Sequence, residues 1–492
     1  MKLFDLRGGV HPEGRKDIST ERHIRVLPLP KKLFVPLQQH IGAPANPVVK
    51  VGDHVLKGQL IATAQGAVSS SVHAPTSGVI TALGDFPAPH PSGLPVPTIT
   101  IESDGEDKWG AIESVDDPLS LSPENIAARV AAAGIVGLGG ATFPSALKLN
   151  LSRASGVQTL IMNGGECEPY LTCDDRIMRE RAVEIVEGIR LIAQAVDAKE
   201  IIVGIEDNKP EAIAAMQAAA QGTAVNVVAM PSMYPMGSEK QIIQVLIGKE
   251  VPAGGRPADI GVLVHNVATA FAVQQAIRHG KALVSRLVTI SGGAIKTPCN
   301  VEALIGTPVQ ELIDFADGYT QPAARLVLGG PMMGQQFTST EVPVVKGTSG
   351  VLALTAAEIG QAEASPCIRC STCVRACPVG LVPLEMMTRI RASDLASAVK
   401  LGLRDCIACG SCSYVCPAHI PLVHYFNYAK GDLATQERAK LKQEATKKLA
   451  DARNERIARI ERERAEAAAR RKAAREAKER AAKEAAAKAE VV

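Results

Sequence analysis

Strand-like and helix-like patterns alternate along the middle of the chain, between residues 120 and 280. Four short apolar runs have the length and composition of buried strands, and apolar residues recur at helical spacing between them. The runs are 159–162, 201–205, 225–228 and 260–264, and one long helix is expected between the first two, from about residue 174 to 196. This alternation is typical of a parallel sheet with crossover helices, so an α/β domain is expected. Ligands of such sheets bind beyond the carboxyl ends of the strands.

A glycine-rich loop, residues 134–144, lies between two expected helices. The first helix follows Ser122 and Pro123, an N-cap with proline in the first turn, and the second runs through Lys148. Glycines let backbone N–H groups approach a phosphate, and the following helix N-terminus adds a favourable dipole. The glycines can instead serve tight packing. The loop also differs from the usual dinucleotide fingerprint, because a helix precedes it rather than a strand.

Two smaller β patterns flank this segment. Residues 48–82 form short alternating stretches around paired glycine turns and resemble the barrel-sandwich domains that carry lipoyl or biotinyl groups. The tip of the expected hairpin, residues 65–71, contains no lysine to carry such a group, so a packing or docking module is expected. Residues 284–335 predict another β unit with one helix, in which the stretch 329–334 is interpreted as a turn rather than a second phosphate loop.

Eight of the eleven cysteines fall in two tight runs. Both runs read C-x2-C-x2-C-x3-C-P, a spacing that lets successive thiolates wrap a cubane cluster while the proline turns the chain away. In two-cluster ferredoxins the fourth cysteine of each run binds the other cluster. Two [4Fe–4S] clusters are therefore expected, one held by Cys367, Cys370, Cys373 and Cys416, the other by Cys406, Cys409, Cys412 and Cys377.

Structural zinc is the alternative for these cysteines. Zinc sites pair C-x2–4-C knuckles across a longer loop, a pattern that fits the two compact runs poorly. The spacer 378–405 repeats apolar residues at helical spacing, so a helical ferredoxin-type domain is expected. Cys167, Cys173 and Cys299 have no ligand spacing and are expected to be ordinary thiols.

The charges are unevenly distributed. The formal net charge is +3, but 18 of the 54 Lys and Arg and 12 of the 51 Asp and Glu lie in residues 432–492. The rest holds 36 basic and 39 acidic groups, which excludes the basic footprint of a nucleic-acid-binding protein. Residues 461–490 have no apolar side chain larger than alanine and cannot form a core. Charge pairs four residues apart favour a single solvated helix there, either a solubilising tail or a segment that docks on anionic lipid or a partner.

No stretch of 18 uncharged apolar residues occurs, so a membrane-spanning helix is not expected. Residues 1–17 carry charges and lack a continuous apolar segment, so no secretory signal is expected and the protein should stay in the cytoplasm.

Four separated motifs, 134–148, 163–169, 234–239 and 266–269, resemble in the same order the flavin-binding subunit of bacterial NADH:quinone oxidoreductase. The resemblance implies non-covalent FMN and NADH as substrate. Asn163 and Glu166 would lie beside the isoalloxazine and the incoming nicotinamide, and Glu166 and Glu239 are the implied catalytic carboxylates. The implied cofactor-binding residues are Gly137, Gly139, Gly140, Phe143, Lys148, Asn163, Glu166, Gly237, Glu239, Asn266 and Thr269.

The sequence departs from that family at two positions. Gly165 stands where the family usually has Asp, and Ser238 where it has Glu, so the site is expected to be less acidic. For Glu166 and Glu168 the alternative interpretation is a solvated loop carboxylate.

The order of the modules resembles the C subunit of the Rnf/Rsx ion-translocating electron transport complex over nearly the whole chain. The fold expected is a multidomain α/β plus β protein. Its expected parts are an arm and barrel-sandwich domain (1–115), a parallel α/β FMN and NADH domain (116–283), a soluble-ligand-binding β-grasp module (284–340), a two-[4Fe–4S] ferredoxin-type domain (360–430) and a charged helical tail (431–492).

This resemblance implies a peripheral, NADH-linked oxidoreductase subunit on the cytoplasmic face of the bacterial inner membrane. NADH gives up two electrons as hydride and each cluster accepts one, so a flavin belongs between them. The implied partners are membrane-embedded and peripheral subunits of the same complex, through which the chain associates with the membrane, and ferredoxin or flavodoxin as an indirect redox partner.

Two alternatives stay open at this point. A soluble flavin and iron–sulfur reductase of the cobalamin-reductase type shares these modules, although the N-terminal position of the barrel-sandwich pattern favours the Rnf interpretation. A zinc-stabilised, non-redox docking scaffold is the alternative from another class.

Overall fold

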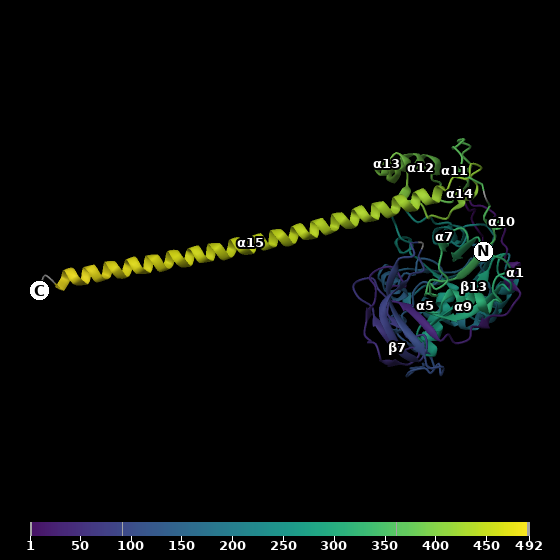
Figure 1. Ribbon diagram of the computed structural model, residues 1–492, viewed down its shortest axis with the longest axis horizontal. Coiled ribbons are helices and arrows are strands. Elements are labelled where there is room, and N and C mark those ends of the chain that lie inside the picture. Colours follow the sequence, from purple (N-terminus) through teal and green to yellow (C-terminus); the bar gives the residue numbers. More distant parts are fainter. Residues whose placement is uncertain (1, 91, 361, 490–492) are drawn as a thin grey trace. The chain divides into compact units, whose positions relative to one another are not determined.

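The computed structural model describes residues 2–90, 92–360 and 362–489 (Figure 1). Contacts divide the chain into two units, Met1–His424 and Tyr425–Val492, and each is described by itself. Among the described residues, no helix combines the length and the apolar character that crossing a lipid bilayer requires.

Two small antiparallel sheets form the N-terminal module, after the short helix α1 (Asp17–Thr20). Side chains alternate along much of the strands, so that Leu33, Val35, Ile99 and Ile101 are fully buried while Lys32, Phe34, Thr100 and Glu102 are more exposed. One sheet has the order β2 (Lys32–Pro36), β8 (Pro95–Ser103), β7 (Gly78–Pro87), β4 (His54–Val55), and the other has the order β3 (Asn46–Pro47), β5 (Leu60–Thr63), β6 (Val72–His73).

A four-stranded parallel sheet forms the centre of the next module, as the alternating pattern predicted. Its order is β11 (Val225–Met230), β10 (Glu200–Glu206), β9 (Thr159–Gly164), β12 (Val262–Asn266). From β9 the chain adds strands on one side and then returns to add β12 on the other. The strand order therefore reverses between β9 and β12, where open α/β sheets bind their ligands.

Helices cover both faces of this sheet, and their starts follow simple chemistry. Ser122 caps the first one by accepting a hydrogen bond from the Asn125 N–H, with Pro123 at the first helical position, which confirms the expected start. The helices are α2 (Pro123–Ala132), α3 (Ser145–Ala154), α4 (Cys173–Glu180), α5 (Ala182–Val196), α6 (Pro210–Ala220), α7 (Glu239–Ile247) and α8 (Val267–Arg278).

One helix differs from the expectation. The sequence predicted a single helix from about residue 174 to 196, but α4 and α5 are separate because Arg181 leaves the helical region, with φ −133° and ψ 30°. The side chains of α4 are held by distant groups: Asp175 accepts a hydrogen bond from the Thr20 hydroxyl, and Arg176 donates to the Thr20 carbonyl. These contacts tie α4 to the N-terminal arm, while α5 packs on α8.

A mixed six-stranded sheet forms the third module, with α9 (Val309–Phe315) packed in the same apolar core. Two of its strands come from outside the expected range 284–340, because the arm adds β1 at one edge and β17 pairs between β13 and β15. The order is β1 (Arg25–Val26), β14 (Cys299–Leu304), β13 (Ser285–Ser291), β17 (Gly350–Leu354), β15 (Arg325–Leu328), β16 (Gln335–Phe337).

The cysteine segment is helical, as expected, and its backbone repeats. A residue n of the first run corresponds to residue n + 39 of the second, as Cys367 and Cys406 do. Left-handed residues recur at matching places, Arg369 with Ala408 and Ser371 with Gly410. The short elements are α10 (Ala356–Ile359), α11 (Thr372–Ala376), α12 (Pro383–Arg391), α13 (Leu395–Lys400), η3 (Leu403–Asp405) and α14 (Ser411–Tyr414).

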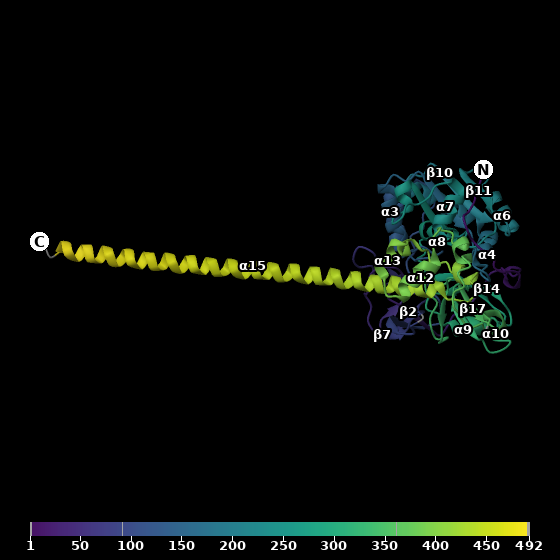
Figure 2. The same cartoon turned by 90° about the horizontal axis from the view of Figure 1, so that it is seen from above.

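The last helix, α15 (Leu422–Ala489), is one unbroken element of 68 residues, drawn from green to yellow in Figure 2. At 1.5 Å per residue it is about 100 Å long. It begins within the expected cluster segment rather than near residue 431. Described side chains from residue 434 to 486 are exposed, and ion pairs four residues apart, such as Arg475 with Glu479, support the helix.

Deletion of residues 461–492 should leave the rest of the protein folded, because the described side chains of this segment are exposed and bury no core. The midpoint of thermal unfolding of the remaining protein should stay the same, while circular dichroism loses only helical signal. A shorter deletion of residues 476–492 is the matched control and should lose proportionally less. A collapse of flavin or iron content in either variant would contradict the prediction.

Candidate functional site

The structure brings the four flavin-like motifs together at the carboxyl edge of the parallel sheet. Asn163 and Asn266 end the neighbouring strands β9 and β12 and lie side by side in register. Asn163 Nδ2 donates to the Gly237 carbonyl at 2.7 Å, and Asn163 Oδ1 accepts from the Gly165 N–H at 2.9 Å. Motifs about 75 and 100 residues apart in sequence thus form one edge.

The glycine-rich loop is held against this edge. The Leu138 N–H donates to Thr269 Oγ1 at 3.0 Å, which fastens the loop to the first turn of α8. A Cβ on Gly139 would lie 2.7 Å from Asn266 Cβ, so only glycine allows this approach. A Cβ on Gly140 would meet no described atom within 4 Å. The loop therefore presents backbone to open space, as binding of a phosphate or a flavin requires.

Phe143 and Lys148 flank the same loop. Phe143 is half-buried, and its carbonyl accepts from the Gly137 N–H at 2.9 Å. Lys148 Nζ donates to Glu239 Oε1 and to the Val264 carbonyl, both at 2.7 Å. The Lys148 side chain stays 30% exposed, so its ammonium can bind an anion in the open space.

Glu166 lies buried at the N-terminus of α4, so the solvated-loop alternative is wrong for this residue. Its carboxylate accepts from the backbone N–H groups of Asp174 at 2.9 Å and Asp175 at 3.3 Å, and from the Cys173 thiol. Burial raises the pKa of Glu166 to about 7, against the opposing effect of the Lys16 ammonium. A buried carboxyl that titrates near neutral pH can hold or release a proton beside the pocket.

Two lysines lie beneath this loop, Lys209 buried and Lys16 half-buried, and the sequence analysis did not predict them. Lys16, from the N-terminal arm, donates to the carbonyls of Glu168 at 2.9 Å and Leu171 at 2.6 Å. Lys209 pairs with Glu206 and donates to Asn208 Oδ1 at 2.9 Å. The polar run that follows β10 was the available signal for Lys209. Nothing in the arm singled out Lys16.

Glu168 is half-buried, and its carboxylate is held by the backbone rather than solvated. Its carboxylate accepts from the backbone N–H groups of Met332 at 3.0 Å and Met333 at 2.9 Å. The glycine-rich turn of the third module therefore binds a carboxylate of this chain, in agreement with its interpretation as a turn. Burial raises the pKa of Glu168 to about 7, although these two hydrogen bonds oppose the shift.

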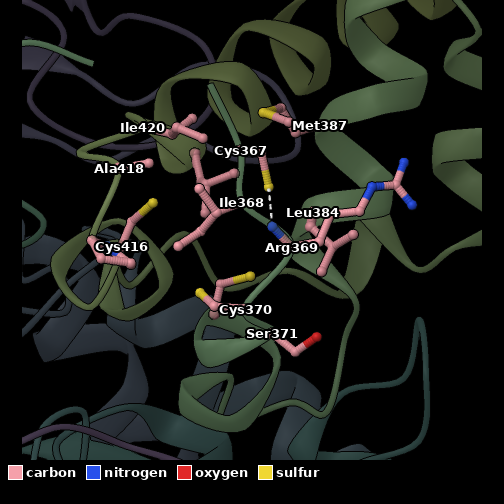
Figure 3. Close-up of a pocket in the computed structure, with 13 residues that line it drawn as sticks. Cys367, Ile368, Arg369, Cys370, Ser371, Leu384, Met387, Cys416, Ala418 and Ile420 are labelled. Carbon is pink, nitrogen blue, oxygen red and sulfur yellow. Dashed lines mark hydrogen bonds between the residues drawn. The ribbon is translucent and has the colours of Figure 1, made fainter. Parts of the chain in front are cut away.

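The first set of cysteines lines one pocket (Figure 3). Cys416 of the second run joins three cysteines of the first, which is the exchange of ligands expected from the spacing. The pocket wall is apolar, with Leu384, Met387 and Ile420 among its members. The Arg369 N–H donates to Cys367 Sγ at 3.4 Å, a contact of the kind that tunes cluster potentials. The cysteines of the pocket are Cys367, Cys370, Cys373 and Cys416.

The second set gathers in the same way. Burial raises the pKa of the Cys412 thiol to about 12, and the nearby thiols of Cys409, Cys406 and Cys377 raise it further. The N–H groups of Ala408 and Leu381 donate to the sulfurs of Cys406 at 3.4 Å and Cys377 at 3.3 Å. Crowded thiols ionise only when a metal compensates their charge, so both sets fit [4Fe–4S] clusters.

Known proteins from three bacteria match this chain closely, and each is the C subunit of its complex. The C subunit of the ion-translocating oxidoreductase complex of Rhodobacter capsulatus is 54% identical to this chain over 442 residues. These residues cover 89% of this chain and 85% of that protein. The C subunit of the proton-translocating ferredoxin:NAD(+) oxidoreductase complex of Clostridium ljungdahlii is 44% identical to this chain, over 89% of this chain and 96% of that protein. The Pseudomonas aeruginosa relative is 46% identical over 92% of this chain, which spans 58% of that longer protein.

The chain belongs to the RnfC family, the C subunits of ion-translocating oxidoreductase complexes. Four family models match successive parts of this RnfC-family chain: the RnfC barrel sandwich hybrid domain at 4–106, the Nuo51 FMN-binding domain at 130–275, the SLBB domain at 287–336 and the 4Fe-4S dicluster domain at 360–444. These matches confirm the expected types of domain and the cofactors FMN and [4Fe–4S]. The roles of single residues stay predictions.

A Gly139→Ala substitution in this RnfC-family chain should weaken FMN binding at least tenfold. The added Cβ would displace the Asn266 side chain at the pocket edge, and tenfold corresponds to about 1.4 kcal/mol. FMN titration of flavin-depleted protein measures the affinity. Gly84→Ala is the matched control, because a Cβ there meets no described atom within 4 Å. Equal FMN affinity in Gly139→Ala and wild type would place the site elsewhere.

A Glu166→Gln substitution should change how stability depends on pH. The folded pKa of about 7 lies above the ordinary value of 4.5, so the folded protein binds the extra proton between these values. Wild type therefore loses stability as pH rises from about 4.5 to 7, on the order of 3 kcal/mol. The Glu166→Gln variant has no carboxyl to deprotonate at this position, so it does not lose this stability as pH rises. The unfolding temperature of the variant minus that of wild type should therefore increase between pH 4.5 and about 7. A constant difference would contradict the prediction.

Proposed function

We propose that the protein is the peripheral electron-transfer subunit of an ion-translocating oxidoreductase complex and exchanges electrons between NADH and the other subunits. The observation that carries this proposal is that one compact unit holds both the four flavin-like motifs, gathered at one edge of the sheet, and two sets of four cysteines. A bound flavin converts between two-electron hydride and single electrons, and a bound cubane carries one electron at a time. Both are needed to connect NADH to a one-electron chain.

The residues of the pocket bind and orient. Gly137, Gly139 and Gly140 would offer backbone to the FMN phosphate and ribityl chain, and Lys148 would supply a positive charge to the phosphate. Thr269 and Asn266 fasten the loop and the edge on which the flavin would lie. Because Glu239 already holds Lys148, it would orient that ammonium.

The remaining residues of the site would face the ring and the incoming nucleotide. Asn163 would lie beside the isoalloxazine, with its amide direction fixed by the Gly237 carbonyl. Glu166 would hold or release a proton near the ring, and Phe143 would stack on a nucleotide base. Gly165 leaves this wall without the carboxylate usual in the flavin-binding relatives, so NADH would meet a less acidic surface.

The family supports the other subunits of the complex as partners. We place the chain on the cytoplasmic side of the bacterial inner membrane, bound through membrane-embedded subunits, with ferredoxin or flavodoxin as an indirect redox partner. Family membership favours this function over a soluble reductase of the cobalamin-reductase type. The dicluster match favours iron over structural zinc. We keep the division of the chain at 1–115, 116–283, 284–340, 360–430 and 431–492 as a working proposal.

Anaerobic purification followed by metal and flavin analysis tests this function. About eight irons, acid-labile sulfide and one FMN are expected per chain, with little zinc. NADH should bleach the flavin absorption and produce the paramagnetic signal of reduced clusters. Colourless protein with stoichiometric zinc, or a flavin that NADH fails to reduce, would refute the proposal.

A Cys406→Ser substitution should remove one cluster. Iron should fall from about eight to about four per chain, because the other set keeps its four cysteines, while FMN content stays unchanged. Reduction of an artificial one-electron acceptor by NADH should decrease at least tenfold. Cys299→Ser is the matched control, since Cys299 lies buried in β14, outside both sets. Normal acceptor reduction by Cys406→Ser would argue against an electron path through these cysteines.

A further inference from the structure

One short turn touches both the flavin pocket and a cysteine set. The turn follows β11 and ends where α7 begins. At one end, the carbonyl of Gly237 accepts a hydrogen bond from Asn163 Nδ2 at 2.7 Å. At the other end, the Tyr234 hydroxyl donates to the backbone carbonyl of Cys409 at 2.6 Å. This one turn therefore connects a wall of the flavin pocket to a cluster ligand.

Tyr234 is held firmly in this position. The residue is 2% exposed, and its backbone pairs with Val10 of the N-terminal arm in both directions, at 2.9 and 2.8 Å. A tyrosine phenol is ordinarily protonated at physiological pH, so the Tyr234 hydroxyl donates this hydrogen bond.

The surroundings of Tyr234 are apolar and come from several modules. Val10, Tyr234, Ala376 and Cys409 form one buried cluster, against which Met332 of the third module packs. The arm also contacts the residue beside the ligand Cys377, because the Gly9 N–H donates to the Ala376 carbonyl at 3.0 Å. The cysteine set that includes Cys377 and Cys409 is thus fixed against the flavin module from two sides.

The other cysteine set lies in a different environment. Cys367 and Cys370 are exposed, and Ile368 between them is 69% exposed. The described lining of its pocket comes from residues 367–422 alone. Among the described hydrogen bonds, none joins this set to the turn that carries Tyr234.

We propose that Tyr234 is a positioning residue that fixes the cluster of Cys377, Cys406, Cys409 and Cys412 as the first to exchange electrons with the flavin. The cluster of Cys367, Cys370, Cys373 and Cys416 then exchanges electrons with the next carrier at the surface. This assignment rests on the proposed function. In the overall reaction NADH becomes NAD⁺, each cluster gains one of the two electrons, and one proton is released.

The Tyr234 hydroxyl places the positive end of its O–H dipole at the backbone of the ligand Cys409, and positive charge near a cluster favours its reduced, more negative state. Tyr234→Phe should therefore lower the equilibrium constant for reduction of the first cluster by up to about tenfold. For one electron, this corresponds to a fall of about 59 mV in the reduction potential. Redox titration followed by paramagnetic resonance measures the shift. Rapid mixing with NADH should show slower cluster reduction and unchanged flavin reduction.

Tyr170→Phe is the matched control, because this buried phenol donates to Glu358 at 2.8 Å, outside the junction. It should leave both potentials unchanged. Combining Tyr234→Phe with Cys370→Ser, which removes the surface cluster, assigns the shift to the remaining one. Unchanged potentials and rates in Tyr234→Phe, or a shift confined to the surface cluster, would overturn the assignment.

A second experiment keeps Tyr234 intact and tests the order directly. In Cys370→Ser, NADH should still reduce the remaining cluster at the wild-type rate. In Cys406→Ser, the flavin should still be reduced, but the remaining surface cluster should be reduced at least tenfold more slowly. Equal rates or the reverse pattern would overturn the order. Failure of the proposed function would look different, because NADH would then reduce neither cluster in the unmodified protein.

Discussion

The cysteine segment has to hold eight sulfur atoms close together, although their ionised forms, the thiolates, repel one another. Burial and neighbouring thiols strongly disfavour the ionised form of Cys412, so four thiolates can share each site only when iron compensates them. The backbone meets this demand by turning left-handed at equivalent places in two repeats, such as Arg369 and Ala408. In these conformations N–H groups point at sulfur.

Charged groups also lie close together at the flavin edge, but there hydrogen bonds and lysines compensate them instead of iron. The buried Glu166 and the half-buried Asp174 lie close together, and their oxygens are satisfied by the N-terminus of α4 and by Asn266. Lys16 and Lys209 place positive charge beneath the same loop. Because one of these ammoniums comes from the N-terminal arm, the pocket depends on chain segments that a flavin domain alone would not contain.

Local patterns predicted what depends on local chemistry. Cysteine spacing identified both runs and the exchange of Cys377 and Cys416, and the polar ends of four apolar runs located the carboxyl edge of the sheet. The break at Arg181 and the place of β17 were missed, because contacts with the arm and pairing with β13 decide them. The burial of Glu166 was missed because its loop folds back onto the N-terminus of α4, a tertiary contact that no local pattern records.

The exchange of cysteines between the two repeats has a consequence for how the protein is made. In the grouping of cysteines described above, each half of the segment supplies three sulfurs to one set and one sulfur to the other, so neither set is complete until both halves exist. With these sets as cluster ligands, the first cluster would have all its ligands only after the ribosome has passed Cys416. Iron would then be delivered late in the maturation of this chain, and each cluster would join both halves from the moment it is inserted.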